Sequence, residues 1–267
     1  MRHSGSRAWR PRLVALDIDG TLVDRNGLLP PTVADAVELI LHAGVPVVLS
    51  TGRSWHGTRP LFDELGLPPG PTVCSNGAVV VRYPPEEIIK AITFDPRPVI
   101  TEVESFAPGT LIAVEEIGRG YRLNDRFPGD DLTGELIIED AEQLSSRPVT
   151  RVILRDPTRS EEEFVALARH LGMHGVTYFI GWGTWLDIAP DGVNKATALA
   201  EVAAGFGVPA ADVLAFGDGR NDIEMLRWAG RGVAMGDAPD EVKAAADDIT
   251  KSIDDGGPAA ELRHWFG

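Results

Sequence analysis

The segment LVALDIDGTLVD places two aspartates, Asp17 and Asp19, one residue apart at the end of an apolar run. Burying a carboxylate is costly unless a partner offsets its charge, so both side chains require one. A carboxylate that faces a phosphate group can act as a nucleophile and replace one difficult hydrolysis with two easier steps through an aspartyl-phosphate. Asp17, at the strand end, is the candidate nucleophile, and Asp19, on the same side of an extended chain, is the candidate general acid and base.

Polar residues also follow the later apolar runs of the sequence. The run VPVVLST ends in Thr51 and is followed by Gly52 and Arg53. Asn76 lies within TVCSNG, and the run VLAF is followed directly by GDGRND at residues 217–222. In an open parallel sheet, ligands bind outside the carboxyl ends of the strands, so we expect these groups to converge at one edge. The acidic groups would repel one another there unless a cation lay among them, and hard oxygen ligands favour Mg²⁺.

A transferring phosphoryl group carries negative charge that the site must offset. A lysine, a hydroxyl and backbone amides can supply that compensation together with a metal ion. Lys195 and Thr51 fit the first two roles.

The elements that carry these residues begin in a β-α-β-α-β order. Leu13 to Asp17 predicts a buried strand, and a capping box of Thr32 with Asp35 predicts the start of a helix that ends at Gly44. VPVVLST then predicts a strand buried on both faces, a helical stretch follows at Leu61 to Leu65, and TVCSNGAVVV predicts a third strand. This order implies a parallel sheet with right-handed crossovers.

The pattern changes in the middle of the chain. The strand-like runs EIIKAITF, TLIAVEE, VTRVILR and VTYFI alternate there with helical stretches at Val99 to Phe106 and Glu161 to Leu171. This alternation of strand-like and helical segments predicts a second unit, of the α+β class.

The first pattern resumes with a helix over Lys195 to Phe206, the strand VLAFGD, a helix over Asp222 to Ala229 and the strand GVAMGD. We therefore expect an α/β fold in which a Rossmann-like parallel-sheet core, residues 13–82 and 188–267, carries an inserted α+β cap domain, residues 83–187.

The composition limits the classes of partner. With 267 residues, 43% of them hydrophobic, the chain is long enough for one large domain or for a core domain that carries a smaller one. A net charge of -15 argues against nucleic acid or an anionic membrane as the main partner. The single cysteine, Cys74, cannot form an internal disulfide, and no transmembrane run is present, so we expect a cytoplasmic protein. The basic opening lacks the apolar region of a signal peptide, and residues 1–12 are expected to form a disordered tail.

Four motifs in order carry a family resemblance. DIDGT, the Thr of LSTGR, the Lys of GVNKATAL and the stretch GDGRND resemble the motifs of the haloacid dehalogenase-like (HAD-like) phosphatase superfamily. The insertion between the third strand and the lysine, and the ending TKSIDDGGPAAEL, resemble the Cof-type branch of sugar-phosphatase-like hydrolases. The resemblance spans the chain from about Leu13 onward. It implies a Mg²⁺-dependent phosphomonoester hydrolase that acts through an aspartyl-phosphate on a small phosphorylated metabolite, with a sugar phosphate expected.

Carried over by position, the resemblance assigns the metal site. It makes Asp17 the nucleophile and a Mg²⁺ ligand, and Asp19 the general acid and base and a ligand through its backbone carbonyl. Asp218 completes the protein ligands, while Asn221 and Asp222 hold that ligand and the waters of the metal in place.

The resemblance also implies a substrate-binding set. Thr51 and Lys195 bind the phosphoryl oxygens, and Gly52, Arg53 and Asn76 are further candidates. Two interpretations of Arg53 stay open, a surface arginine and a phosphate contact. Asn76 either shapes a turn or borders the substrate.

Alternative functions use the same residues. A phosphosugar mutase would pass the aspartyl-phosphate to another hydroxyl instead of water, and a noncatalytic sensor would only bind a phosphorylated metabolite. Every motif residue is intact, which argues against the sensor. A nucleotide-binding oxidoreductase is disfavoured because DIDGT stands where G-x-G-x-x-G would follow the first strand. The chain is expected to be a monomer or a homodimer, without a nucleic acid or membrane partner.

Overall fold

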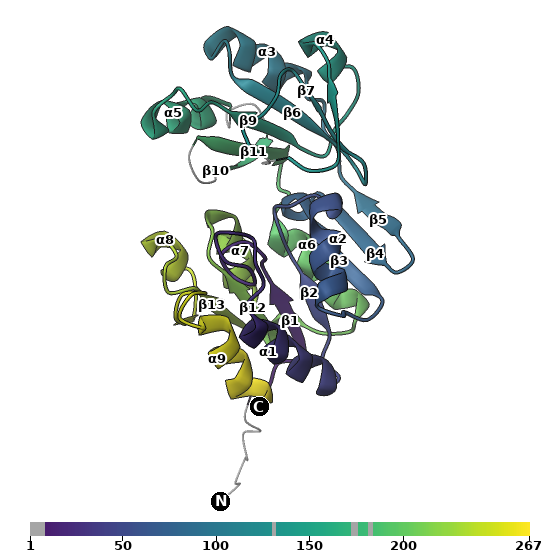
Figure 1. The fold of residues 1–267 in the computed structure, drawn as a ribbon, viewed down its shortest axis with the longest axis vertical. Coiled ribbons are helices and arrows are strands. Elements are labelled where there is room, and N and C mark those ends of the chain that lie inside the picture. Colours follow the sequence, from purple (N-terminus) through teal and green to yellow (C-terminus); the bar gives the residue numbers. More distant parts are fainter. Residues whose placement is uncertain (1–8, 130–131, 172–175, 181–183) are drawn as a thin grey trace, which may run out of the picture.

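The computed structural model describes residues 9–129, 132–171, 176–180 and 184–267. Figure 1 shows two parts stacked along the long axis. The first and last portions of the chain form the lower part, the core, and the middle portion forms the upper part, the cap. The inserted arrangement expected from the sequence is therefore visible in the path of the chain.

A five-stranded parallel sheet lies at the centre of the core, in the order β14-β13-β12-β1-β2. Its strands are β1 (Leu13–Leu16), β2 (Val47–Leu49), β12 (Val213–Gly217), β13 (Arg231–Ala234) and β14 (Asp248–Ile249). All four residues of β1 are buried and apolar, as expected for a strand between layers of helices. The predicted α/β class with a parallel core sheet is confirmed.

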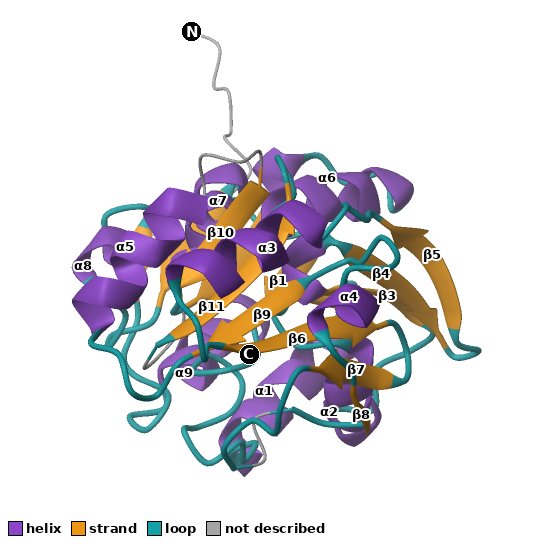
Figure 2. Ribbon diagram, turned by 90° about the horizontal axis from the view of Figure 1, so that it is seen from above, coloured by secondary structure: helices purple, strands orange, loops and turns teal. Residues whose placement is uncertain are grey.

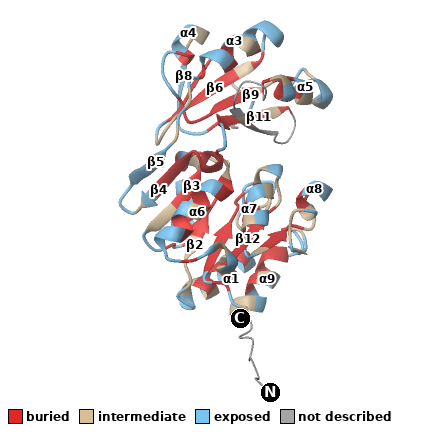
Figure 3. Ribbon diagram, turned by 180° about the vertical axis from the view of Figure 1, so that it is seen from behind, coloured by how far each residue is buried: buried red, intermediate tan, exposed pale blue. Residues whose placement is uncertain are grey.

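Helices cover both faces of this sheet. In Figure 2, α6 and α7 lie on one side of β1, and α1, α2 and α9 lie on the other. Their bounds, with that of the short α8, are α1 (Pro31–His42), α2 (Trp55–Glu64), α6 (Lys195–Gly205), α7 (Ile223–Trp228), α8 (Asp240–Lys243) and α9 (Gly257–Phe266). Figure 3 shows that buried residues are concentrated in the strands and on the helix surfaces that face them.

The start of α1 differs from the expected capping box. Pro30 occupies the N-cap position without a side-chain hydrogen bond, and Pro31 is the first helical residue. Proline suits this position because its missing N–H would have no helical partner there and its backbone angle already matches the helix. The prediction of a cap formed by Thr32 and Asp35 is wrong.

The expected third parallel strand is also wrong in part. The chain turns back at residues 75–77, so that β3 (Gly70–Cys74) pairs antiparallel with β4 (Val79–Tyr83), and β4 pairs with β5 (Glu87–Ala91). Ser75, Asn76 and Gly77 have φ of 50°, 54° and 100°, a left-handed path that a continuous strand cannot follow. A bridge between Ser50 and Val73 keeps a parallel relation to the end of β2.

A six-stranded sheet forms the cap, in the order β10-β11-β9-β6-β7-β8, with β7 and β8 as the parallel pair. Figure 1 places the cap helices on the side of this sheet that faces away from the core. The elements are α3 (Arg97–Phe106), β6 (Leu111–Glu116), β7 (Gly120–Leu123), β8 (Glu135–Ile138), α4 (Ala141–Leu144), β9 (Val152–Arg155), α5 (Glu161–Leu171), β10 (Val176–Ile180) and β11 (Trp185–Pro190). Strand β5 falls within the range expected for the cap, yet it is hydrogen-bonded to the sheet of β3 and β4.

The expected N-terminal tail is described only from Trp9 onward, and residues 1–8 lie outside the described part of the chain. The Trp9 indole donates a hydrogen bond to the carbonyl of Ala211 at 2.8 Å and its ring packs edge-on against Trp265. Residues 9–12 therefore contact the core. Among the described residues, no helix has both the length and the apolar composition needed to cross a membrane.

Candidate active site

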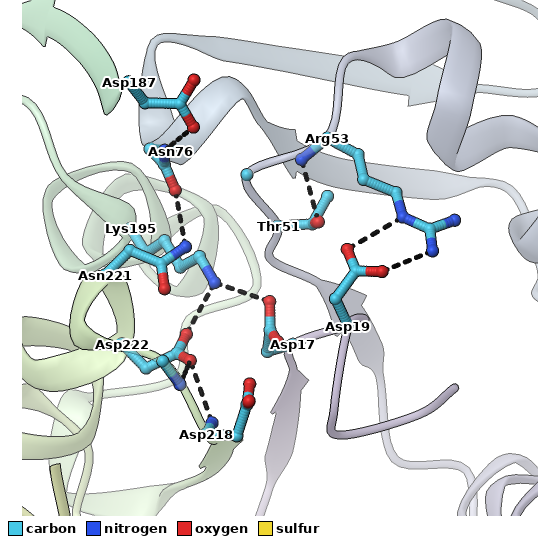
Figure 4. Close-up of polar contacts among 12 residues, drawn as sticks. Asp17, Asp19, Thr51, Arg53, Asn76, Asp187, Lys195, Asp218, Asn221 and Asp222 are labelled. Atoms are coloured by element: carbon cyan, nitrogen blue, oxygen red, sulfur yellow. Dashed lines mark hydrogen bonds and ion pairs between the residues drawn. The ribbon is translucent and has the colours of Figure 1, made fainter. Parts of the chain in front are cut away.

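Lys195 joins two carboxylates at the carboxyl ends of β1 and β12 (Figure 4). Its Nζ donates to Asp17 Oδ1 and to Asp222 Oδ1, each at 2.6 Å. Lys195 and Asp222 have no exposed surface, and Asp17 is 4% exposed. Burial lowers the pKa of Lys195, but the two carboxylates outweigh that effect, so its pKa is raised and the ammonium stays charged. The three side chains form a buried, hydrogen-bonded ion cluster.

The start of α6 fixes the position of this lysine. Asn194 caps the helix, since its side chain accepts a hydrogen bond from the Thr197 N–H and its own N–H donates to the Thr197 hydroxyl. Gly77 packs against Asn194, where a Cβ would lie 2.2 Å from the Asn194 carbonyl oxygen. The first residue of the helix, Lys195, is thereby held beside the turn after β3.

Asp218 lies next to the ion cluster, after β12. Burial and the charges of Asp17 and Asp222 raise the pKa of Asp218 to about 9. Burial and the charge of Asp222 also raise the pKa of Asp17 to about 7, although Lys195 opposes them. Gly20 has a φ of 75°, and a Cβ there would lie 2.3 Å from Asp218 Oδ2. The glycine of DIDGT therefore allows the first loop to approach Asp218.

Asp222 organises the GDGRND loop from within. Its Oδ2 accepts hydrogen bonds from the backbone N–H groups of Asp218 and Gly219, at 3.0 and 2.9 Å. Gly217 passes so close that a Cβ there would lie 2.4 Å from Asp222 Cγ. Asp222 thus fixes the backbone that presents the Asp218 side chain.

The acidic cluster fits a divalent cation. Oxygen atoms of Asp17, Asp218 and Asp222 lie within 4.8 Å of one another. Burial raises the pKa values of Asp17 and Asp218, and the neighbouring carboxylates raise them further, so a cation among these groups would offset a cost that Lys195 alone does not remove. Because Asp222 directs its oxygens to Lys195 and to two backbone amides, Asp17 and Asp218 are the carboxylates best able to offer oxygen to a metal. An all-oxygen donor set of this kind suits Mg²⁺.

Asp19 points away from Lys195 and toward Arg53 (Figure 4). Nε and Nη2 of Arg53 donate to the two Asp19 oxygens, at 2.9 and 2.5 Å. Burial lowers the pKa of Arg53, but the hydrogen bonds and charge of Asp19 outweigh it and raise that pKa. The Arg53 N–H donates to the Thr51 hydroxyl at 3.1 Å. Arg53 is therefore a partly buried arginine that is paired with Asp19, and 28% of its side chain is exposed.

Asn76 connects the core to the cap. Its Oδ1 accepts from Asn221 Nδ2 at 2.9 Å, and its Nδ2 donates to Asp187 Oδ2 at 3.3 Å (Figure 4). It is 1% exposed and left-handed, a conformation that asparagine tolerates better than most residues. Asn76 therefore does shape the turn after β3, and its amide also links Asn221 to a residue of the cap.

Three cap residues reach the core loops that carry the site, and the sequence did not indicate them. Arg151 donates through Nη1 to the Gly52 carbonyl. Glu115 accepts from the Ser75 hydroxyl at 2.9 and 2.7 Å. Asp187 accepts from Asn76, as described above. None belongs to a motif, although Glu115 and Arg151 are charges within the strand-like runs TLIAVEE and VTRVILR.

The structure brings the sequence-predicted residues together in one region, at the carboxyl ends of β1, β2 and β12, at the turn after β3 and at the start of α6. It separates them into an ion cluster around Lys195 and a second pair formed by Asp19 and Arg53. The set is Asp17, Asp19, Thr51, Gly52, Arg53, Asn76, Lys195, Asp218, Asn221 and Asp222.

Comparisons with known proteins cover nearly the whole chain. The family of haloacid dehalogenase-like hydrolases matches residues 14–262. Pyridoxal phosphate phosphatase YbhA of Escherichia coli (strain K12) is 32% identical over 91% of this chain and 96% of its own. The phosphatase YitU of Bacillus subtilis (strain 168), named for 5-amino-6-(5-phospho-D-ribitylamino)uracil, is 29% identical over 96% of this chain and 98% of its own. A solved sugar phosphatase of HAD subclass IIB has a TM-score of 0.81 at 25% identity, over 95% of this chain and 98% of that one.

Proposed function

The chain belongs to the haloacid dehalogenase-like hydrolases and is a phosphatase, and from this premise we propose that it hydrolyses phosphate monoesters of small metabolites through an aspartyl-phosphate on Asp17. The observation that carries the proposal is the buried cluster in which Lys195 bridges Asp17 and Asp222 beside Asp218. A phosphate group at this edge would meet a carboxylate nucleophile and a fixed positive charge.

In the first step, an oxygen of Asp17 attacks phosphorus, the P–O bond of the ester breaks, and Asp19 gives its proton to the leaving oxygen. In the second step, Asp19 takes a proton from water, which attacks the phosphorus of the aspartyl-phosphate and releases inorganic phosphate and the Asp17 carboxylate. Arg53 keeps the Asp19 side chain at the rim of the site, where 61% of it is exposed, so it can reach a bound ester.

Lys195 has two roles in this scheme. Its ammonium lowers the pKa of Asp17 against the effect of burial, which favours the ionised nucleophile. It also supplies positive charge that a phosphoryl group needs while bonds form and break. Asp222 fixes the position of the ammonium, because Lys195 and Asp222 are both fully buried and joined by a hydrogen bond.

Asp17 and Asp218 would hold Mg²⁺, with Asp222 and Asn221 supporting Asp218 and the backbone carbonyl of Asp19 as a further oxygen. When bound, the ion would offset negative charge on the phosphoryl oxygens. The residues of the chain do the remaining work of binding, attack and proton transfer.

Relatives that match over nearly their whole length support the proposed substrate class. Their names join phosphate to pyridoxal and to a ribitylaminouracil, and the solved neighbour is called a sugar phosphatase. A small phosphorylated metabolite is the class that these names share, and we extend it to this chain with sugar phosphates as the first candidates.

The test is phosphate release from p-nitrophenyl phosphate and from a panel of sugar and cofactor phosphates, in Mg²⁺ or in EDTA. Wild type should release inorganic phosphate only in Mg²⁺, and Asp17→Asn should lose at least about 1,000-fold in kcat. Asp63→Asn, which changes an exposed aspartate of α2, is the matched control. Activity that survives in Asp17→Asn would refute the nucleophile, and a phosphorylated isomer in place of free phosphate would indicate a mutase.

A further inference from the structure

Arg151 of the cap is a buried cation that reaches across to the core. The residue is 3% exposed and immediately precedes β9. Its Nη1 donates to the main-chain carbonyl of Gly52, and its Nη2 donates to the Tyr121 hydroxyl at 2.5 Å. Its charge is offset within the cap, since Nε lies 3.5 Å from Glu115 Oε2 and Nη1 lies 3.6 Å from Asp187 Oδ1.

The surroundings of Arg151 fix the direction of its guanidinium. The guanidinium carbon lies 5.6 Å from the centre of the Tyr121 ring, and its neighbours Glu115 and Asp187 are themselves buried. Burial lowers the pKa of Arg151, but the groups around it outweigh that effect, so the pKa is raised and the charge persists. A buried charge is costly unless its hydrogen bonds are made, and the Gly52 carbonyl is the partner that the core supplies.

Gly52 stands between two residues of the proposed site. The Thr51 hydroxyl accepts from the Arg53 N–H across it, and Arg53 holds Asp19. A Cβ on Gly52 would lie 3.2 Å from Asn76 Oδ1, so this peptide also packs against the turn after β3. A change in the direction of the Gly52 carbonyl would therefore move the hydroxyl of Thr51 and the arginine that holds Asp19.

We infer that Arg151 is a positioning residue for the phosphate-binding loop at residues 51–53, and that it orders this loop only when the cap is docked on the core. The inference rests on the proposed phosphatase activity. Nη1 and Nη2 of Arg151 both donate to protein atoms, so its effect on the reaction passes through the Gly52 carbonyl rather than through the substrate.

Arg122 offers a matched control. It is also a buried arginine of the cap, 2% exposed, but its guanidinium bonds to Glu116, to Glu139 and to the Gln143 carbonyl, all within the cap. Arg151→Met and Arg122→Met each remove one buried guanidinium from the same domain. Only the first removes a contact with the core loop.

The experiment measures kcat and KM for p-nitrophenyl phosphate in Mg²⁺, with thermal unfolding of each variant to correct for the folded fraction. Misplacement of reacting groups by about 1 Å lowers the reaction rate by up to about 100-fold. Arg151→Met should therefore lower kcat by about 10- to 100-fold. The kcat of Arg122→Met should stay within about 3-fold of wild type. The single ammonium of Arg151→Lys cannot replace both hydrogen bonds, to Gly52 and to Tyr121, so its kcat should fall between those of wild type and Arg151→Met.

A kcat of Arg151→Met within about 3-fold of wild type would overturn the inference, as would an equal loss in Arg122→Met, which would indicate a general effect of cap stability. If Arg151→Met does not fold, Arg151→Lys decides, because an unchanged kcat in that variant would also overturn it. These outcomes are distinct from failure of the proposed function, in which wild type itself would release no phosphate from any ester.

Discussion

Replacement of Lys195 by Met tests the ion cluster directly. Lys195 has no exposed surface and donates to Asp17 and Asp222 at 2.6 Å each. Removing one member of a buried ion pair typically costs about 3–5 kcal/mol, because the remaining charge is left uncompensated. We expect the free energy of unfolding of Lys195→Met to fall by about 3–5 kcal/mol at pH 8 in metal-free buffer. Met is one atom shorter than Lys and fills most of the same space, so the loss comes mainly from the charge and its two hydrogen bonds.

This loss should be smaller at pH 5. The pKa of Asp17 is about 7 even beside Lys195, and removal of the ammonium raises it further. An acid whose folded pKa is raised binds its proton more readily in the folded state, so its ionisation reduces stability as pH rises from the unfolded pKa toward the folded one. At pH 5 the Asp17 carboxyl is neutral in both proteins, whereas at pH 8 only wild type offsets its charge. The difference should be at least about 1 kcal/mol, since one pKa unit corresponds to about 1.4 kcal/mol.

Urea unfolding followed by tryptophan fluorescence, in EDTA at pH 5 and pH 8, measures both quantities. Lys90→Met is the control, because Lys90 pairs with Glu201, 62% of whose side chain is exposed. That pair should contribute less than about 1 kcal/mol, with little dependence on pH. A loss for Lys195→Met below about 1 kcal/mol, or one equal at the two pH values, would refute the assignment of Lys195 as the partner of buried charge.

Two further predictions concern the acidic loops. Gly20→Ala and Gly27→Ala form a matched pair, because both positions have a φ of 75° but only a Cβ at position 20 would meet Asp218, at 2.3 Å. Each substitution should lower the free energy of unfolding by about 1 kcal/mol. Only Gly20→Ala should also lower Mg²⁺-dependent phosphate release, by at least about 10-fold. Equal activities of the two variants would contradict the role of Gly20 beside Asp218. Asp218→Asn should stabilise the metal-free protein at pH 8 by about 1–3 kcal/mol. The pKa of Asp218 is about 9 in the folded state and 3.8 in the unfolded state, so the unfolded state loses this proton first and wild-type stability falls as pH rises between these two values. Urea unfolding across this range should show a flatter pH profile for the variant, and parallel profiles would rule out a strained carboxylate at Asp218.

The sequence predicted the core sheet and the residues at its strand ends because these features are local. An apolar run that stops at Asp17 indicates both a buried strand and the place where it meets solvent. Parallel topology then brings strand ends together without further information, which is why Asp218, after β12, lies beside Asp17 although far from it in sequence. Lys195 reaches Asp17 from the first turn of α6 instead. The family resemblance rests on the same short motifs.

A turn at Asn76 was one of two interpretations of that residue, but the reversal after β3 was not part of the predicted fold. The sequence SNG lies between β-branched runs, and Asn-Gly in that setting favours a tight reversal with positive φ. Reading TVCSNGAVVV as one strand gave more weight to the valines than to this dipeptide. The reversal places Asn76 against Asn221 and Asp187, so the error in the fold also hid a connection of the site.

The contacts between cap and core were beyond local reasoning, because Arg151 and Gly52 are 99 residues apart and Asn76 and Asp187 are 111 apart. Once the sheet is known, however, alternation along its strands accounts for them. Even-numbered residues such as Ile112 and Val152 pack with the helices of the cap, whereas Glu115, Arg151 and Asp187 are odd-numbered and share the opposite face. That face looks toward the core (Figure 1), and all three charges on it contact core residues: Glu115 accepts from Ser75, Arg151 donates to Gly52 and Asp187 accepts from Asn76. Charges at odd positions therefore mark the surface by which the cap meets the active-site loops.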